Sequence, residues 1–158
     1  MEIIEKRTGA ACVALDQSRF WIVGGFVGSK RFLSSTKFIE LGQHSVNGPD
    51  MPFTIEAHSM IQYDEKSIYI IGGNQECSIW SNKTWIVDLT NGFQIKEGPS
   101  LNKGRRDHSC AKMTLNGRTI LVVAGGEGEG LFETLDSVEI LDPSGNNVWT
   151  PGLYFKLQ

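Results

Sequence analysis

Cysteine is scarce in this chain of 158 residues, which has only Cys12, Cys77 and Cys110 and no Cys-x-x-Cys pair. An odd number of cysteines cannot form a complete set of disulfides, and the missing paired spacing argues against a zinc site. We therefore expect buried free thiols in a protein kept in a reducing compartment.

Long apolar runs are also absent. No segment approaches the roughly 18 apolar residues that a membrane span requires. The first ten residues, MEIIEKRTGA, lack the extended apolar core of a signal peptide. The sequence predicts a cytoplasmic protein without a membrane partner.

Excess positive charge is missing as well, because 15 Lys and Arg stand against 18 Asp and Glu, for a net charge of -3. A chain that binds a phosphate backbone is normally basic, so we do not expect a nucleic-acid partner. The hydrophobic share of 40% is that of an ordinary globular protein, and the length favours one domain.

Helical periodicity is not sustained anywhere, and Gly, Pro, Asn, Asp and Ser interrupt the chain about every 8 to 12 residues. What recurs instead is an apolar run that ends in two glycines: FWIVGG, IYIIGG and ILVVAGG. The pairs are Gly24 and Gly25, Gly72 and Gly73, and Gly125 and Gly126, with spacings of 48 and 53 residues. A period near 50 indicates a repeat protein.

Other features keep the same phase as the glycine pairs. A second β-like run follows each pair, and a run of small and apolar residues precedes it, so each unit offers four short strands. The following runs are 36–41, 84–89 and 137–142, and the preceding runs are 9–15, 58–63 and 108–115. The sequence predicts an all-β fold built from three repeated units.

These units resemble the kelch repeat, in which an apolar strand closes with Gly-Gly and a Trp stands near the end of the unit. The resemblance implies three four-stranded antiparallel blades, at about 1–54, 55–104 and 105–158, forming an open partial β-propeller. The glycines are then expected at positive φ or in close contact with a neighbouring blade. Trp149 is the signature Trp; Ser45 or Val46, and Phe93 or Ile95, take its place in the other units.

Three blades cannot close a ring, since propellers carry about 4 to 8. Two explanations remain: the chain is a piece of a longer protein, or two copies complete a six-bladed ring. We favour the piece, because neither terminus has the polar character of a capping repeat. The open blade faces are also expected to promote self-association.

Catalysis is not expected, and neither is a cofactor. Asp107, His108 and Ser109 include the residue types of a hydrolytic triad, but consecutive strand residues point to opposite faces. His58 and His108 occupy equivalent repeat positions and lack the further ligands of a metal site. GGEGEG at 125–130 resembles a phosphate loop but lacks the following helix and the lysine. A kelch-type copper oxidase is the enzymatic alternative.

Partner binding is the favoured function. In kelch adaptors an Arg before the innermost strand and a Ser at the third strand line the axial mouth; by resemblance these are Arg7 and Arg106, and Ser35 and Ser137. The middle unit has Glu56 or Ala57, and Lys83, in their place. Two such arginines would favour an acidic peptide. Arg7, Lys103, Arg105 and Arg106 are equally well interpreted as solvated loop charges.

The resemblance implies the substrate-recognition part of a ubiquitin-ligase adaptor, a family that commonly joins the propeller to a BTB domain and a cullin ligase. A cytoskeletal kelch protein that binds actin is the alternative. Cys12 and Cys110 fall at equivalent places on the first strands, where packing is favoured over redox sensing.

Overall fold

The computed structural model describes residues 5–28, 31–75, 80–130 and 133–152. All regular secondary structure in these ranges is β-strand, which confirms the expected all-β fold. None of the described residues belongs to a helix long and apolar enough to cross a membrane. Cys77 lies outside the described residues.

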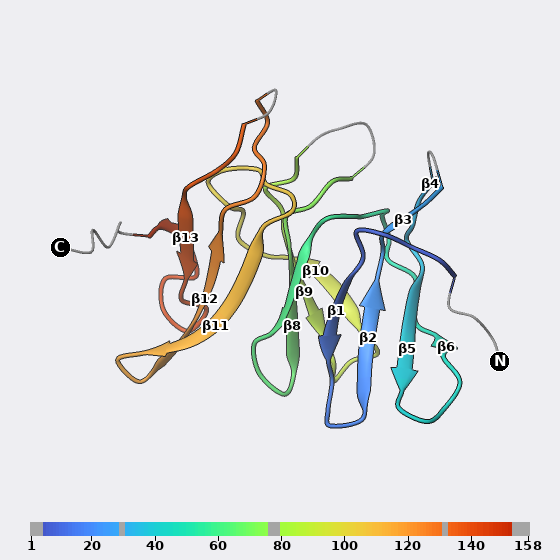
Figure 1. Cartoon of the computed structure of the whole chain (residues 1–158). Helices are drawn as coiled ribbons and strands as arrows, with labels where there is room; N and C mark the ends of the chain where they lie inside the picture. The colour runs from blue at the N-terminus through green and yellow to red at the C-terminus, as the bar shows by residue number, and fades with distance from the viewer. Residues whose placement is uncertain (1–4, 29–30, 76–79, 131–132, 153–158) are drawn as a thin grey trace.

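Three four-stranded antiparallel sheets follow one another along the chain (Figure 1). Strands neighbouring in a sheet succeed one another in the sequence, apart from the β3–β4 hairpin inserted in sheet 1. Sheet 1 contains β1 (Ala11–Ala14), β2 (Arg19–Val23), β5 (Thr36–Glu40) and β6 (Val46–Asn47). Sheet 2 contains β7 (Ser59–Gln62), β8 (Ser67–Ile71), β9 (Thr84–Asp88) and β10 (Gln94–Glu97). Sheet 3 contains β11 (Ser109–Leu115), β12 (Arg118–Ala124), β13 (Val138–Leu141) and β14 (Thr150–Pro151).

A short hairpin of β3 (Phe26–Val27) and β4 (Arg31–Phe32) follows the first glycine pair. Phe26 and Phe32 pack edge to face across it, with ring centroids 5.2 Å apart. The 50-residue period gave no indication of this hairpin, which forms a separate two-stranded sheet. Single bridges from Asn74 to Trp80 and from Glu127 to Thr134 repeat its Phe26–Phe32 pairing in the other two units.

The strand register recurs in all three sheets and defines equivalent positions. The last residue of each second strand pairs with the first residue of the third: Val23 with Thr36, Ile71 with Thr84, and Ala124 with Val138. Equivalent residues of the second strands are therefore 48 and then 53 positions apart, as the glycine pairs are.

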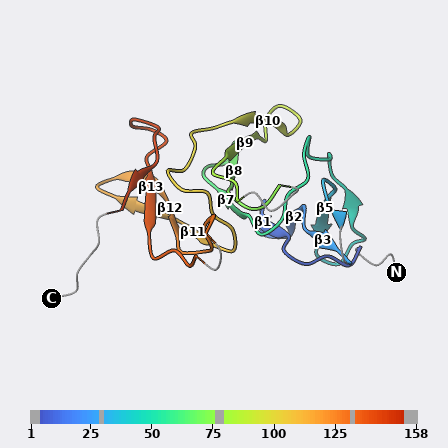
Figure 2. The same ribbon diagram turned by 90° about the horizontal axis from the view of Figure 1, so that it is seen from above.

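The core lies between the sheets rather than within any one of them. β1 lies beside β7, and β7 beside β11. Seen from above, these first strands approach one another near the middle of the molecule, and β10 and β13 lie farther out (Figure 2). Alternating side chains of each sheet consequently face the next sheet.

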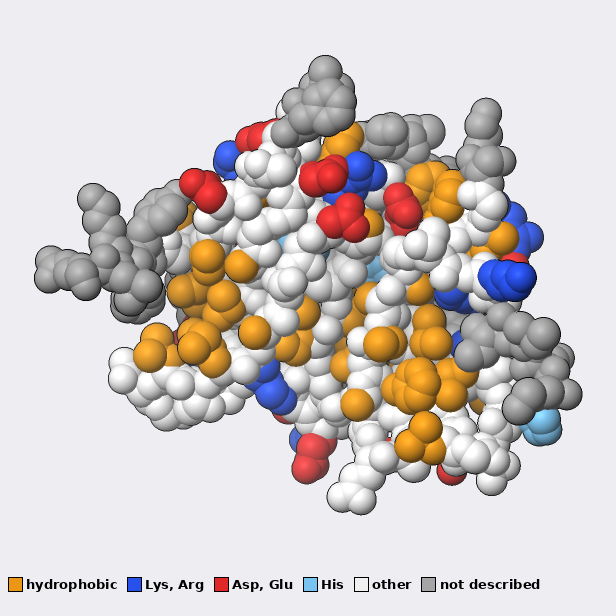
Figure 3. Space-filling view, viewed as in Figure 1, with side chains coloured by type: hydrophobic (Ala, Val, Ile, Leu, Met, Phe, Trp, Pro, Cys, Tyr) orange, Lys and Arg blue, Asp and Glu red, His pale blue; other side chains and the backbone are white. Residues whose placement is uncertain are grey.

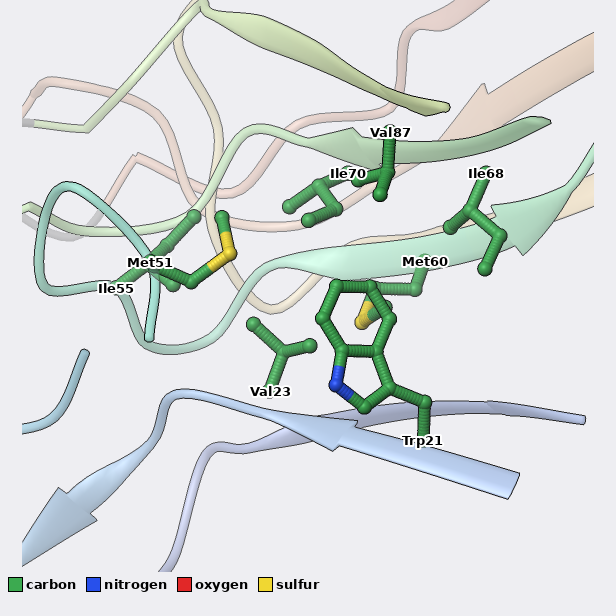
Figure 4. Packing of buried hydrophobic residues seen from close by; sticks show 8 residues of the cluster. All are labelled: Trp21, Val23, Met51, Ile55, Met60, Ile68, Ile70 and Val87. Carbon is green, nitrogen blue, oxygen red and sulfur yellow. The ribbon is translucent and has the colours of Figure 1, made fainter. Parts of the chain in front are cut away.

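Two apolar clusters fill the junctions. Figure 4 shows Trp21 and Val23 of sheet 1 directed toward Met60 and Ile70 of sheet 2. The junction between sheets 1 and 2 buries Trp21, Val23, Met51, Ile55, Met60, Ile68, Ile70 and Val87. The junction between sheets 2 and 3 buries Tyr69, Ile71, Leu101, Leu121, Val123, Leu141 and Trp149. By strand register the second set repeats the first, position by position, over most of its length.

The glycine pairs make the corners where each second strand meets the next sheet. All six glycines have positive φ. A Cβ on Gly24 would lie 2.2 Å from the carbonyl oxygen of Ile55, and one on Gly72 would lie 2.6 Å from that of Arg105. Both the backbone angle and the approach of the neighbouring sheet therefore require glycine.

Trp149 is buried in the outer part of the second junction, and its Nε1 donates to Thr84 Oγ1 at 3.1 Å. Gly48, Gly98 and Gly152 each donate a backbone hydrogen bond to the first residue of the third strand of their sheet, so they occupy equivalent positions after the three outer strands. This alignment assigns Ser45 and Ile95 as the counterparts of Trp149. The outer strand β6 of sheet 1 has only two residues, both exposed.

Candidate functional site

The candidate site is the end of the sheets at which the second strands stop at glycine pairs and the connecting loops emerge. A single backbone bridge recurs there before each first strand; it joins Thr8 to Phe26, Glu56 to Asn74, and Arg106 to Glu127. The residues immediately before these bridges, Arg7, Ile55 and Arg105, are therefore structurally equivalent.

Arg7 crosses the glycine corner of its own sheet and is nearly buried, with 5% of its side chain exposed. Its Nη1 donates to the carbonyl oxygens of Gly24 at 2.8 Å and Ser35 at 3.0 Å, and its Nη2 donates to Ser35 Oγ at 3.2 Å. The guanidinium thus joins the Gly-Gly corner to the start of the third strand.

Arg105 repeats this arrangement in sheet 3. Its Nη1 donates to the carbonyl oxygens of Gly125 at 2.9 Å and Ser137 at 3.2 Å, and its Nη2 donates to Ser137 Oγ at 3.1 Å. The side chain is fully buried and also pairs with Glu139 at 2.9 Å. The counterpart of Arg7 is therefore Arg105, and the expected match with Arg106 is displaced by one residue.

Glu139 completes a buried polar network found in sheet 3. Its carboxylate accepts hydrogen bonds from the backbone N–H and Nδ2 of Asn102, at 2.7 and 2.8 Å. The backbone N–H of Lys103 adds a third at 3.2 Å. Because a buried carboxylate is costly unless paired and hydrogen-bonded, Arg105 and Glu139 depend on each other.

Sheet 2 has no arginine at the equivalent place. Ile55 is fully buried there, and Lys83 stands where Ser35 and Ser137 stand in the other sheets. The Lys83 ammonium instead forms an ion pair with Glu97. The arginine and serine pair is therefore present in sheets 1 and 3 and replaced in sheet 2.

Arg106 lies on the loop surface, which is the surface formed by the connecting loops at the Gly-Gly end of the sheets. Its Nη2 and Nε donate to Glu127 Oε2 at 2.7 and 3.0 Å, and its guanidinium lies 5.1 Å from the ring centroid of Trp80. The hydrogen bond to Glu127 is the main cause that raises the pKa of Arg106. Of the two arginines expected to bind a partner, Arg106 keeps 30% of its side chain exposed.

Acidic groups surround Arg106. Asp107 is 58% exposed and lies 3.7 Å from Arg106 Nε, and Glu127 is 44% exposed. Glu56 accepts a hydrogen bond from Asn74 Nδ2 at 3.2 Å nearby. Figure 3 shows acidic and basic side chains gathered together at the upper end of this face. The loop surface is thus mixed in charge rather than uniformly basic.

The two repeated histidines lie beneath this surface and are buried. His108 Nε2 lies 2.8 Å from Ser59 Oγ of the neighbouring sheet. Burial, with a smaller contribution from the charge of Arg105, lowers the pKa of His108 to about 4. Burial, with a smaller effect of His108, lowers the pKa of His58 to about 3. Both histidines are therefore neutral near pH 7 and serve as packed polar groups.

The hydrogen bonding here does not form a triad within residues 107–109. The partner of His108 is Ser59, whereas Asp107 faces Arg106. Within the described ranges no three His, Cys, Asp or Glu side chains lie together as metal ligands.

The two described cysteines occupy equivalent places, as expected, but differ in exposure. Cys110 packs in the junction with sheet 2, its Sγ lies 3.4 Å from the carbonyl oxygen of Met60, and burial raises the pKa of its thiol. Cys12 is exposed, contrary to expectation, because it lies on the face of sheet 1 that is turned away from sheet 2.

A groove that sequence reasoning missed lies at the opposite end of sheets 1 and 2. It encloses about 490 Å³, and its walls include Leu15, Phe38, His44, Val46 and Phe93. It opens where β6 is short. Neither Ser45 nor Ile95, the counterparts of Trp149, lines it, so the missing outer Trp gave no signal of it.

Neither the scan against protein-family models nor the search of curated proteins found a match.

Proposed function

We propose that the chain is a non-catalytic protein-binding module whose three sheets are kelch-type blades of an open partial β-propeller. The observation that carries this proposal is the repeated corner: in sheets 1 and 2 the second glycine of the pair donates to a carbonyl of the next sheet. Gly25 donates to Ile55 at 2.7 Å, and Gly73 donates to Arg105 at 2.8 Å. Sheets joined by one recurring contact are the construction principle of a propeller.

The partner contacts the loops at the Gly-Gly end, which rigid sheets hold in place. Trp80 and Arg106 carry the recognition, because both keep exposed surface and a partner carboxylate can compete with Glu127 for the guanidinium. Arg7, Ser35 and Ser137 act indirectly, since their hydrogen bonds hold the corners on which these loops are built. The preferred partner is a protein segment that presents an acidic side chain.

The module would serve as the substrate-recognition part of a cytoplasmic ubiquitin-ligase adaptor, with cullin machinery reached through a domain outside this sequence. Affinity capture from cytoplasm, followed by identification of bound proteins, tests this assignment. Recovery of a protein that binds wild type but not the R106A variant supports it. Co-sedimentation with actin filaments would instead establish the cytoskeletal alternative, and copper retained after purification would favour the oxidase.

A matched control is available at the other end of the sheets. Arg118 also pairs with a carboxylate, Asp142, at 3.1 Å and is 66% exposed. R118A removes the same charge far from the loop surface, so it should leave capture unchanged. Equal loss of capture in R106A and R118A would contradict a binding surface at the Gly-Gly end.

A further inference from the structure

The two junctions between sheets are built from the same pair of backbone hydrogen bonds. At the first junction Gly25 donates to Ile55 at 2.7 Å, and Ala57 donates to Gly9 at 2.7 Å. The second junction repeats them: Gly73 donates to Arg105 at 2.8 Å, and Asp107 donates to Ala57 at 2.9 Å. Each sheet therefore offers a fixed set of donors and acceptors to the sheet before it and the sheet after it.

The outer sides of sheets 1 and 3 carry the same groups without a neighbouring sheet. On sheet 3, the N–H of Gly126 and the carbonyl of Asp107 have no hydrogen-bond partner among the described residues. On sheet 1, the carbonyl of Arg7 and the N–H of Gly9 likewise have no hydrogen-bond partner among the described residues. Donor and acceptor thus match across the two ends: Gly126 to Arg7, and Gly9 to Asp107.

The space at the third glycine corner is also open. A Cβ on Gly125 would approach only the carbonyl oxygen of Leu135, at 3.6 Å. At Gly24 and Gly72 the carbonyl of the next sheet takes that space, at 2.2 and 2.6 Å. The corner at Gly125 has the positive φ of the other two and leaves room for a neighbouring carbonyl.

Apolar side chains lie on both outer faces; on sheet 1 they lie beside Lys37, which pairs with Ile22 across the strands and donates to Asn47 Oδ1. On sheet 1 these side chains are Cys12, Phe20, Ile22 and Ile39. By strand register they correspond to Met60, Ile68, Ile70 and Val87 of sheet 2, which are buried. Those of sheet 3 are the counterparts of Trp21, Val23 and Phe38: Val122, Ala124 and Ile140. Except for the exposed Cys12, all are half-buried. Figure 3 shows hydrophobic side chains gathered over β1 and β2 and again over β11 to β13.

We propose that two copies of this chain associate head to tail, with sheet 3 of each copy packed against sheet 1 of the other. This inference rests on the blade arrangement of the proposed function. It takes the second explanation for three units, a ring completed by two copies, in place of the longer chain favoured from the sequence. The partner is a second copy because every molecule carries both halves of the junction, and the two junctions already present show how they fit. Two copies provide six sheets, within the range of about 4 to 8 that closes a propeller.

The molar mass in solution tests the proposal. Light scattering coupled to size exclusion should give twice the chain mass of 17.5 kDa. A mass of one chain across the concentration range would overturn the proposal, and a ladder of higher masses would overturn the closed pair.

Two variants place a charge on one face each: I22E on sheet 1 and V122K on sheet 3. Each alone should halve the mass, because both junctions of the pair then contain the charged residue. V46K is the matched control, since exposed Val46 is the counterpart of Lys96 and lies on the outer strand. It should keep the mass of two copies. Circular dichroism must show wild-type strand content for all three.

Mixing the two variants separates head-to-tail association from a symmetric contact between like faces. An I22E copy and a V122K copy share one unmodified junction and one in which Glu faces Lys, so the mixture should recover the mass of two copies. A V122K variant that pairs by itself would show that sheet 3 is not in the interface and would overturn the proposal.

Cys12 reports on the same face independently. Its counterpart Cys110 is covered by sheet 2, so alkylation of Cys12, followed by peptide mapping, should slow at concentrations that favour two copies. An alkylation rate that does not change with concentration would contradict the assignment of the face. Failure of pairing leaves partner capture by the loops of the single chain intact, whereas failure of capture leaves the mass unaffected.

Discussion

The segments that lead into sheets 2 and 3 occupy equivalent positions but are held in place by different contacts. The segment leading into sheet 2 uses apolar contacts: Phe53 stacks on Trp85 with ring centroids 4.5 Å apart, and Ile55 is fully buried. The segment leading into sheet 3 is polar. Arg105 replaces Ile55, and Glu139 stands where Trp85 stands.

The backbone path is nevertheless the same in both. Ile55 donates to the Leu33 carbonyl at 3.1 Å, and Arg105 donates to the Ser81 carbonyl at 3.2 Å. Backbone hydrogen bonds therefore set the position of the segment, while its side chains must match as a set. A change in one member of the polar set should cost more than the same change in an exposed pair.

The largest effect is expected for R105I, which gives sheet 3 the residue of sheet 2 but leaves Glu139 buried without its cation. We expect a loss of about 3 to 5 kcal/mol in the free energy of unfolding, measured with urea. R106A removes the neighbouring, partly exposed arginine and should cost less than about 1 kcal/mol.

The double variant R105I/E139Q sharpens this comparison. Glutamine removes the uncompensated charge and still accepts from Asn102, so the double variant should be more stable than R105I alone. Equal stability of the two would contradict the coupling between Arg105 and Glu139.

Trp149 distinguishes the outer part of the two junctions. W149I gives sheet 3 the residue that sheet 2 has at Ile95; it removes most of a buried ring and the hydrogen bond to Thr84. We expect a loss of about 2 to 4 kcal/mol in the free energy of unfolding, which should be measurable as a lower thermal midpoint. W149F, which keeps a ring, should lose less; a smaller loss in W149I than in W149F would argue against ring packing.

The histidines make sheets 2 and 3 more sensitive to acid than sheet 1, where Ala10 stands at the equivalent place. The folded-state pKa values of about 3 for His58 and about 4 for His108 lie below the ordinary value of 6.5. The unfolded chain therefore binds more protons, and stability present above pH 6.5 is lost as the pH falls toward those values.

Between pH 6.5 and 5 we expect each histidine to remove about 1 to 2 kcal/mol of stability. The variant H58A/H108A copies Ala10 and should show a flatter profile of unfolding free energy in this window. An unchanged slope would mean that other groups control the acid response.

Among the changes to side chains packed between the sheets, the smallest effect is expected for F53L, which keeps an apolar side chain but removes the stacking on Trp85. A loss of about 1 kcal/mol should appear as a small shift of the urea midpoint without a change in slope. A loss as large as that of R105I would contradict the distinction between the apolar and the polar segment.

The strands were predictable because each apolar run ends at Gly-Gly and the period repeats three times. The structural counterpart of Arg7 could not be predicted, because Arg105 and Arg106 are adjacent in the sequence. In addition, β11 and β12 have seven residues each, which lengthens the hairpin of sheet 3. Counting back from the glycines therefore fails. The constant offset from Cys12 to Cys110 was the signal that selects Arg105.

The Arg105–Glu139 network could not be found from sequence, since Asn102 and Glu139 lie 37 residues apart and neither belongs to the repeat. The β3–β4 hairpin escaped because its residue types differ between units: bridges from Asn74 to Trp80 and from Glu127 to Thr134 repeat its Phe26–Phe32 pairing without a shared residue. A period identifies what the units share, and only packing shows how they differ.

The central claim is that the sheets are joined by the repeated backbone hydrogen bonds at their corners. Amide hydrogen exchange measured by NMR on the V122K variant tests it most directly. Gly25, Ala57, Gly73 and Asp107 should exchange far more slowly than Gly126 and than Gly117, which lies in an exposed turn. Exchange of the first four as fast as that of Gly117 would contradict the account.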